Sequence, residues 1–299
     1  MEINGAVLSA LGVGFSAAFQ AGLSEAPEEW KKIATEVASV TSENEYGWLK
    51  DWPSMREWVG DRLIKELSGD SYKIKNKDFE ATVSVKKNDI DDDKLGMYTP
   101  RFKAQGKAAG QWQNNLVWSA LPLGLSEKCY DGQNYFDTDH PVGSKEKGNQ
   151  RTVSNYQAGA KAPWFLLDVK QAIMPIIFQM RQKPELVAQD DASTSERAFM
   201  KKEFLYGVDA RGNVGFSFWQ LAFASKAELT ADNYEAARKA MTSNRTDEDV
   251  PLGIMPNLLV VGPSNEAKAL ALLKKEKLAG GEDNIWQGTA ELLVSPWLE

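Results

Sequence analysis

The sequence predicts an α+β fold. Residues 71–98 alternate between apolar and polar or charged side chains, which is typical of strands. A helix of about twenty residues is predicted directly after them, and short apolar runs alternate with helical segments from residue 160 to the C-terminus. This mixture is typical of α+β proteins. The 299 residues are enough for one large domain or for two to three smaller lobes.

The composition narrows the class of function. The net charge is -7, so tight non-specific binding to nucleic acid, which needs many Lys and Arg facing phosphates, is not expected. The single cysteine, Cys129, excludes an intrachain disulfide and fits a reducing compartment. We find no run of about 18 apolar residues and no basic region at the N-terminus. We therefore expect neither a membrane span nor a secretory signal, and a protein that stays in the cytosol where it is made.

The first 70 residues are predicted to hold an arm and two short helices. The opening segment is rich in Gly and Ala, which indicates an arm or a short helix outside the core. Residues 27–39 are predicted to form an amphipathic helix, because Trp30, Ile33 and Val37 share one face. A second helix is predicted over Met55–Leu67.

Residues Ser71–Tyr98 are predicted to form a long, highly charged β-hairpin. Apolar side chains at every second position, such as Phe79, Ala81 and Val83, indicate strands, and the polar run 88–94 indicates the tip. An isolated two-stranded hairpin is only marginally stable in water, so we expect this one to pack against another surface. We also expect its own subunit to fold without it. The alternative is an ordinary edge hairpin whose charges discourage aggregation between strands.

The longest predicted helix covers residues 99–121. Thr99 is expected as the N-cap and Pro100 as the first helical residue. Five residues recur at helical spacing and share one face, namely Phe102, Ala109, Trp112, Leu116 and Ala120. Such a helix would be about 30 Å long. Gly106 and Gly110 weaken the prediction somewhat.

The C-terminal half is predicted to mix strands with helices. The predicted strands cover residues 162–169, 174–187, 204–208, 214–225, 257–261 and 291–299. The first two are apolar runs bounded by prolines, which indicates burial. Residues 209–213 are predicted to be a turn between two of the strands. Helices are expected to begin after N-caps at Thr230 and Ser264.

The only histidine, His140, stands beside Asp137 and Asp139 and allows two interpretations. The first is a metal-dependent hydrolase. It is weak because metal sites ordinarily use three or more ligands, His being the commonest, and the sequence has no G-x-S-x-G nucleophile elbow. The second is a turn, because Asp and Asn near a proline are turn-forming residues and Pro141 holds His140 extended. The pattern favours the turn.

The order of motifs along the chain resembles a known family. The run "DGQNYFDTDHP" at 131–141 is similar to the DG-x-x-LF-x-T-x-HP signature of tailed-phage major capsid proteins, with Tyr135 in place of Leu, and it follows the predicted long helix directly. The matching residues include Asp131, Gly132, Phe136, His140 and Pro141. Four other stretches resemble the major head subunits of Mu-like phages, the gpT family: "YGWLKDWPSMREWVGDR", "KNKDFEATVSVKKNDIDDDKLGMY", "NLLVVGPS" and "WQGTAELLVSPWLE". The resemblance extends from about Gly14 to the C-terminus.

The resemblance implies a capsid fold of the Hong Kong 97 type. Its parts would be an N-terminal arm at 1–50, an E-loop at 71–98, a peripheral domain at 51–70 and 99–159 with a spine helix at 99–121, an axial domain at 160–277, and a C-terminal strand at 278–299. Residues of the E-loop are expected to contact neighbouring subunits, namely Lys75, Lys77, Phe79, Lys86, Lys87, Asp91, Asp92 and Asp93.

The function that the resemblance implies is that of a major capsid protein, with no active site and no cofactor. Its partners would be copies of itself in hexamers and pentamers, together with portal, scaffold and decoration proteins. The shell would enclose double-stranded DNA without sequence-specific binding, would involve no membrane, and would be assembled in the host cytoplasm as part of the virion. Two alternatives stay open: an encapsulin-like nanocompartment, and the hydrolase that would use Asp137, Asp139 and His140.

Overall fold

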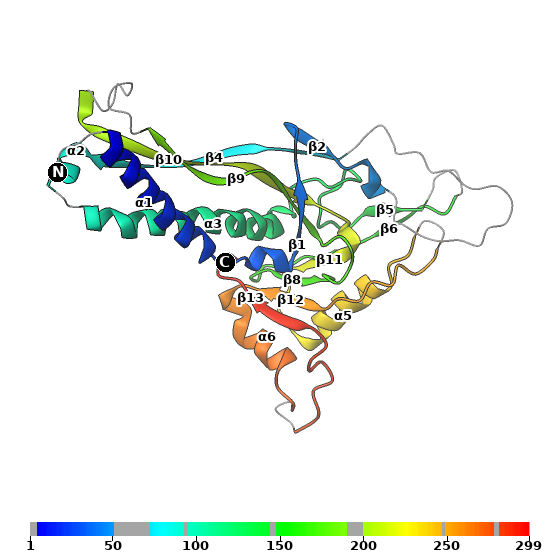
Figure 1. Ribbon diagram of the computed structural model, residues 1–299. Coiled ribbons are helices and arrows are strands. Elements are labelled where there is room, and N and C mark those ends of the chain that lie inside the picture. The colour runs from blue at the N-terminus through cyan, green and yellow to red at the C-terminus, as the bar shows by residue number, and fades with distance from the viewer. Residues whose placement is uncertain are drawn as a thin grey trace.

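The computed structural model describes residues 5–50, 72–92, 95–143, 148–189, 200–246, 249–277 and 281–298. The helix predicted over Met55–Leu67 lies outside these residues. Two helices, α1 and α3, run beside a group of long strands, and a second sheet with two shorter helices lies toward the C-terminal part of the chain (Figure 1). The two sheets share a continuous hydrophobic core that includes Trp118, Phe165 and Phe178.

The long strands form a four-stranded sheet with the order β1-β9-β10-β4. These strands are β1 (Ala34–Ala38), β4 (Lys77–Lys86), β9 (Ile176–Gln189) and β10 (Glu203–Phe216). β10 is antiparallel to both of its neighbours, whereas β1 is parallel to β9. The strand predicted over 174–187 is confirmed as β9.

The prediction of a turn at 209–213 is wrong, because β10 runs through these residues without a break. The pairing with β9 shifts register on both sides of Arg211, so the turn-like composition marks a β-bulge. A side chain at Gly212 would crowd the carbonyl of Gln179 and the indole of Trp112. Glycine at this position therefore allows a close approach and not a reversal of the chain.

Over its described residues, 72–92 and 95–98, the segment does not pair with itself as a hairpin, so that prediction is also wrong. β3 (Lys73–Lys75) pairs with β2 (Glu43–Glu45), whereas β4 pairs with β10 along its whole length. The predicted tip begins inside a short helix, α2 (Lys87–Asp91). Alternation of apolar and polar residues identifies a strand but carries no information about its partner, which here comes from a distant part of the chain.

Helix α3 (Tyr98–Leu123) is the predicted long helix, extended at both ends. It follows a 3-10 turn, η3 (Leu95–Met97), and no side chain caps its start. Thr99 is therefore not the N-cap, and Pro100 lies at the third helical position. A proline is tolerated there because the first N–H groups of a helix have no partner within the helix.

Helix α1 (Gly5–Ser24) belongs to the core, so its interpretation as an arm or short helix outside the core is wrong. Leu8, Phe15 and Phe19 are buried. Phe15 stacks on Phe102 of α3, with ring centroids 4.3 Å apart. Phe15 and Phe102 belong to a third hydrophobic cluster, which also contains residues of β4 and β10.

The stretch Val7–Lys32 is long and apolar enough to cross a membrane by length and composition alone, with a mean hydropathy of 1.4 over its most apolar window. The expectation that no such stretch exists is therefore wrong. The same test is passed by helices that pack inside a fold, and α1 packs along α3 through its buried aromatic residues.

Residues 27–39 form a 3-10 turn and a strand, so the helix predicted there is wrong. The turn η1 (Glu29–Lys32) buries Trp30, and β1 then pairs with β9. β-branched Thr35 and Val37 fit a strand. Pairing with β9 outweighs the helical spacing of the apolar residues, because nearly every backbone N–H and C=O in such a buried position needs a partner.

Five short strands form a second sheet with the order β13-β12-β8-β11-β7. They are β7 (Tyr156–Gln157), β8 (Trp164–Leu167), β11 (Ala222–Ser225), β12 (Leu258–Val261) and β13 (Glu291–Val294). The strands predicted at 162–169 and 257–261 are confirmed in this sheet as β8 and β12, and the strand predicted at 291–299 is confirmed over Glu291–Val294 alone. The C-terminal strand β13 lies parallel to β12, at the sheet edge.

Two helices accompany the second sheet, α5 (Ala231–Thr242) and α6 (Glu266–Leu273). The predicted N-cap of α5 is confirmed, because the side chain of Thr230 accepts a hydrogen bond from the N–H of Asn233. The predicted N-cap of α6 is wrong. A 3-10 turn, η5 (Pro263–Asn265), precedes α6 and takes up Ser264.

The range 160–277 contributes strands to both sheets. β9 and β10 lie within this range but pair with β1 and β4, whereas β8, β11 and β12 belong to the second sheet. Residues 29–50 of the expected N-terminal arm also contribute to the body of the fold, through η1, β1, β2 and the turn η2 (Gly47–Lys50).

Candidate functional site

The signature run 131–141 forms the passage from α3 into a small antiparallel pair, β5 (His140–Val142) and β6 (Arg151–Val153). It opens with a tight turn in which the N–H of Gly132 donates to the carbonyl of Cys129. Gly132 has a φ of +88°, a left-handed conformation that favours glycine. The run also ends as predicted, with His140 and Pro141 extended in β5.

His140 is fully buried, with 0% of its surface exposed, and both of its ring nitrogens have partners. Nδ1 lies 2.7 Å from Oδ2 of Asp131, and Nε2 lies 3.1 Å from Oδ1 of Asn155. The imidazole stacks on the indole of Trp219, with centroids 4.1 Å apart and an angle of 9° between the planes. Trp219 lies in η4 (Trp219–Leu221), just before β11.

The hydrogen bonds around Asn155 decide which of its side-chain atoms faces His140. Its Nδ2 donates to the carbonyls of Tyr135, Trp219 and Ala222, so its Oδ1 is the atom that faces the histidine. Oδ1 is an acceptor, and therefore Nε2 of His140 donates to it. Nδ1 faces a carboxylate, which also accepts. Both ring nitrogens of His140 therefore face acceptors, and one of these acceptors is the Asp131 carboxylate.

The carboxyl group of Asp131 is held in its charged form. Burial acts to raise its pKa, but the hydrogen bond and the charge of His140 outweigh burial, so the pKa lies below its usual value. The N–H of Gln133 and the thiol of Cys129 also donate to this carboxylate, at 3.0 Å and 3.1 Å from Oδ1.

The arrangement does not support the metal-dependent hydrolase. His140 points to Asp131 and Asn155 and not to the two acids beside it in sequence. Asp137 accepts hydrogen bonds from neighbouring backbone N–H groups, and Asp139 is exposed. The three predicted ligands therefore do not converge on one point.

A different group of possible metal ligands, Cys129, Asp131 and His140, lies within 4.8 Å. Its members bond to one another: the thiol of Cys129 and the imidazole of His140 both donate to the Asp131 carboxylate. Burial, followed by the nearby charge of Asp131, raises the pKa of the Cys129 thiol well above its ordinary value. A protonated thiol is a poor metal ligand, so this cluster is a closed hydrogen-bonded network.

The two aromatic residues of the signature join the layers of the fold. Tyr135 stacks on Phe216 of β10 at 4.3 Å, and its hydroxyl donates to the carbonyl of Pro175. Phe136 lies against Phe165 of β8 at 5.5 Å. The signature run after α3 therefore packs against both sheets. Sequence reasoning missed Asn155 and Trp219, and no local motif marks either residue.

The residues predicted to contact neighbouring subunits lie on β3, β4, α2 and the turn after them. Lys75, Lys77 and Lys86 are exposed, and Lys87 is half-buried. Phe79 packs on Trp112 of the same chain, with centroids 4.9 Å apart. Asp91 ends α2 and Asp92 follows it, exposed, whereas Asp93 lies outside the described residues.

The chain matches the family model described as "Mu-like prophage major head subunit gpT" over residues 8–298. It is 42% identical over 285 residues to the "Mu-like prophage FluMu major head subunit" of Haemophilus influenzae, an alignment that covers 93% of this chain and 92% of that protein. It is 38% identical to the "Major capsid protein" of Escherichia phage Mu, with 100% of both chains covered.

Two solved structures resemble the chain over its length. One is the procapsid of bacteriophage JBD30, with 43% identity, a TM-score of 0.87, and coverage of 99% of this chain and 100% of that one. The other is the bacteriophage JBD30 capsid, with 32% identity, a TM-score of 0.79 and 100% of both chains covered. The α+β fold is thus a capsid-protein fold. The chain belongs to the family of Mu-like prophage major head subunits gpT, the major capsid proteins of Mu-like phages, and is a structural protein of the virion and not an enzyme.

Proposed function

We propose that copies of this chain form the hexamers and pentamers of an icosahedral shell that encloses double-stranded DNA. The observation that carries the proposal is the likeness to a chain of the JBD30 procapsid, which has a TM-score of 0.87 at 43% identity and covers 99% of this chain. A likeness of that extent includes both sheets and α3, and therefore the framework that orients each surface toward its neighbours.

The physical properties of the chain support repeated contacts between copies. Heterologous contacts that are repeated by rotation close into rings. A subunit that is held by several neighbours gains avidity even when each contact is weak. The net charge of -7 suits a shell that encloses DNA without binding its phosphates tightly.

The finer division follows the Hong Kong 97 type. In our proposal α3 is the spine helix and forms the peripheral domain with the four-stranded sheet, whereas the second sheet with α5 and α6 forms the axial domain. The charged residues on β3, β4 and α2 are proposed to face neighbouring subunits, together with Asp92 and Asp93 after α2. Portal, scaffold and decoration proteins are the proposed partners. A related capsid, that of JBD30, is decorated with minor capsid protein trimers, at 32% identity to this chain.

Electron microscopy tests the proposal. The chain is expressed in bacteria alone and together with a scaffold protein, and the purified material is imaged in negative stain. We expect closed shells of uniform diameter in at least one of the two conditions. Monomers alone under all conditions would contradict the proposal. Nucleic acid in shells recovered from infected or induced cells would support a phage head, whereas a packaged enzyme would favour an encapsulin-like compartment.

A further inference from the structure

Gln179 of β9 is a polar side chain in the core, with 0% of its surface exposed. Its neighbours Phe178 and Met180 point into the core cluster that includes Trp118, whereas Gln179 points to the opposite face of the four-stranded sheet, as Ile177 does. A methionine would fill the same volume, because it is of similar length and apolar. Packing alone therefore does not explain the amide.

The two-stranded ribbon of β2 and β3 lies on this face of the sheet. In the described part of the chain its strands pair only with each other, and an isolated pair of strands is marginally stable. Nδ2 of Asn213 in β10 donates to the carbonyl of Lys75 at 2.8 Å. A Cβ atom on Gly215 of β10 would overlap the side chain of Ile74. The ribbon therefore rests directly on β10, and its position depends on these contacts.

The amide of Gln179 joins β9 to both strands of the ribbon. Its Oε1 accepts a hydrogen bond from the hydroxyl of Tyr46, just after β2, at 2.9 Å. Its Nε2 donates to the carbonyl of Ile74 in β3 at 3.1 Å and to Oδ1 of Asn76, just after β3, at 2.7 Å. Both N–H groups of the amide are thus used to hold β3, and the oxygen holds the segment that follows β2.

Asn76 extends this network to the turn between β1 and β2. Its Nδ2 donates to Oγ of Ser39 and to the carbonyl of Thr41, each at 2.9 Å. The N–H of Ser39 in turn donates to the carbonyl of Met180 in β9 at 2.9 Å. Hydrogen bonds depend on direction, so a fully satisfied buried network specifies one arrangement where apolar contacts would tolerate several.

The outer side of the ribbon is charged. Glu45, Lys73 and Lys75 are exposed. The ammonium group of Lys73 lies 2.6 Å from the carboxylate of Glu45 and 3.7 Å from that of Glu43. The direction in which the ribbon leaves the sheet therefore decides where these charges stand on the surface of the subunit.

We propose that Gln179 is a positioning residue for shell assembly, because it fixes the direction of the ribbon of β2 and β3 on the four-stranded sheet. The proposal rests on the proposed function, since it takes the charged ribbon to meet another subunit or a partner protein in the shell. Rings close only when the same contact angle is repeated at every subunit. A subunit whose ribbon takes more than one direction offers contacts that do not close.

The substitution Gln179→Met tests the proposal. It keeps the volume and removes the hydrogen bonds, so we expect a folded subunit whose melting temperature is lower by about 2–10 °C. Amide hydrogen exchange of residues 43–46 and 73–76 should become at least about tenfold faster. At a temperature where the variant is fully folded, the yield of shells of wild-type diameter should fall by at least about tenfold, because the error repeats at every subunit.

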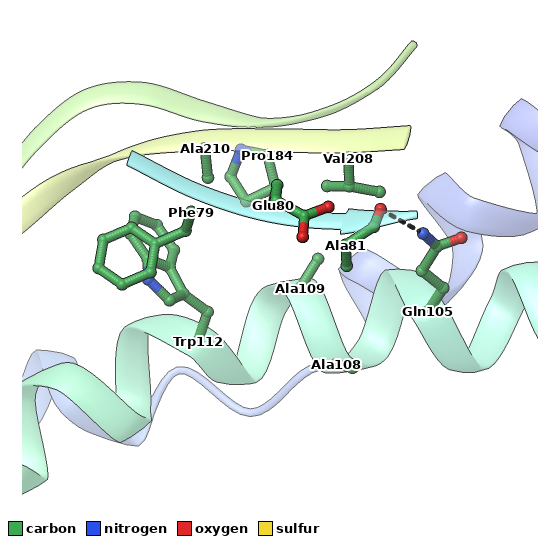
Figure 2. Close-up of a pocket in the computed structure, with 10 residues that line it drawn as sticks. All are labelled: Phe79, Glu80, Ala81, Gln105, Ala108, Ala109, Trp112, Pro184, Val208 and Ala210. Carbon is green, nitrogen blue, oxygen red and sulfur yellow. Dashed lines mark hydrogen bonds between the residues drawn. The ribbon is translucent and has the colours of Figure 1, made fainter. Parts of the chain in front are cut away.

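Gln105→Met is the matched control. Gln105 of α3 is a half-buried glutamine that also joins two elements, through one hydrogen bond from its Nε2 to the carbonyl of Ala81 in β4 at 2.9 Å (Figure 2). This bond does not involve the ribbon. The variant should therefore keep the wild-type exchange of residues 43–46 and 73–76, and the wild-type shell diameter.

Tyr46→Phe provides a second variant that removes only one hydroxyl and leaves the ring in the core. We expect a smaller loss of shell yield than for Gln179→Met. The double variant should be no worse than Gln179→Met alone, because both substitutions remove the same hydrogen bond. Losses that add would overturn the inference, since the two residues would then act separately.

Normal yield and diameter of shells from Gln179→Met would also overturn the inference, even with a lower melting temperature, and would leave the proposed function intact. Unchanged hydrogen exchange of the ribbon in this variant would do the same. Failure of the wild type to form shells would instead remove the proposed function, and with it this inference.

Discussion

Gly106 of α3 lies directly against the backbone of Phe19 in α1. A Cβ atom on Gly106 would overlap the carbonyl of Phe19, and a Cβ on Gly22 of α1 would in turn overlap the carbonyl of Lys103. The two helices therefore approach as closely as their backbones allow. The glycine that weakened the helix prediction is what permits α1 to join the core.

We predict that Gly106→Ala destabilises the subunit by about 1–3 kcal/mol, as overpacking commonly does, and loosens α1. Urea unfolding measures the loss, and hydrogen exchange of residues 5–24 measures the loosening. Gly14→Ala is the control on α1, because a Cβ there has nothing within 4 Å. It should be neutral or stabilising by about 0.5–1 kcal/mol. Equal effects of the two variants would show that close approach is not what Gly106 provides.

The buried pair of His140 and Asp131 is predicted to be a major local contribution to stability. His140→Ala leaves the Asp131 carboxylate without its hydrogen-bond partner and removes the stack on Trp219. Breaking a buried pair from one side costs about 3–5 kcal/mol. Thermal and urea unfolding measure this loss. Asp139→Asn, at the exposed neighbouring position, should stay within about 0.5 kcal/mol of the wild type. A loss of less than about 0.5 kcal/mol for His140→Ala would contradict the hydrogen-bonded network of His140, Asp131 and Asn155.

The lowered pKa of Asp131 predicts how stability depends on pH. In the folded chain the pKa of Asp131 is lower than its usual value of 3.8. At a pH between the folded-state and the unfolded-state pKa, the unfolded chain therefore binds more protons than the folded chain. The stabilisation is fully present above the usual pKa and is lost as the pH falls through the folded-state pKa. We expect Asp131→Asn to flatten the acid side of a stability–pH curve, while Asp139→Asn keeps its slope. Parallel curves for wild type and Asp131→Asn would rule out this linkage.

Alanine substitutions at the two predicted N-caps, Thr230 and Ser264, test which of these residues stabilises its helix. Thr230 caps α5 through its side chain, so Thr230→Ala should lose about 1 kcal/mol. Ser264 lies in η5 and is exposed, so Ser264→Ala should change stability by less than about 0.5 kcal/mol. Chemical denaturation of the two variants side by side decides the matter. The reverse order of effects would mean that α6 is capped as its sequence suggested.

Deletion of residues 75–93 is predicted to prevent folding. This segment includes Val83, Val85 and Ile90, which are buried, and the whole of β4. Loss of β4 would expose the edge of β10 and the aromatic cluster around Phe102. Circular dichroism and size-exclusion chromatography check the result. A soluble, folded deletion variant would contradict this prediction and show that the segment is dispensable for folding of its own subunit.

Prediction from the sequence succeeded where the signal is local. Thr230 caps α5 because a threonine side chain reaches an N–H only three residues away. The strands at 164–167 and 258–261 are confirmed, and both are short apolar runs beside a proline or glycine, a pattern typical of buried strands. It failed where two interpretations of the same residues were close in energy, as at 209–213. Glycine and aspartate favour a turn there, but pairing with β4 and β9 keeps β10 continuous through these residues.

The sequence by itself determined the family, the α+β class, the long helix and the turn that follows it, because these depend on motifs and on spacing between near neighbours. Only the tertiary structure decided that β4 pairs with β10, that α1 lies in the core, and that His140 is paired with Asp131 and Asn155. Each of these relations depends on a contact between side chains or strands whose free energy arises only once the chain has brought both partners together. Residues that lie apart in the sequence carry no local sign of it.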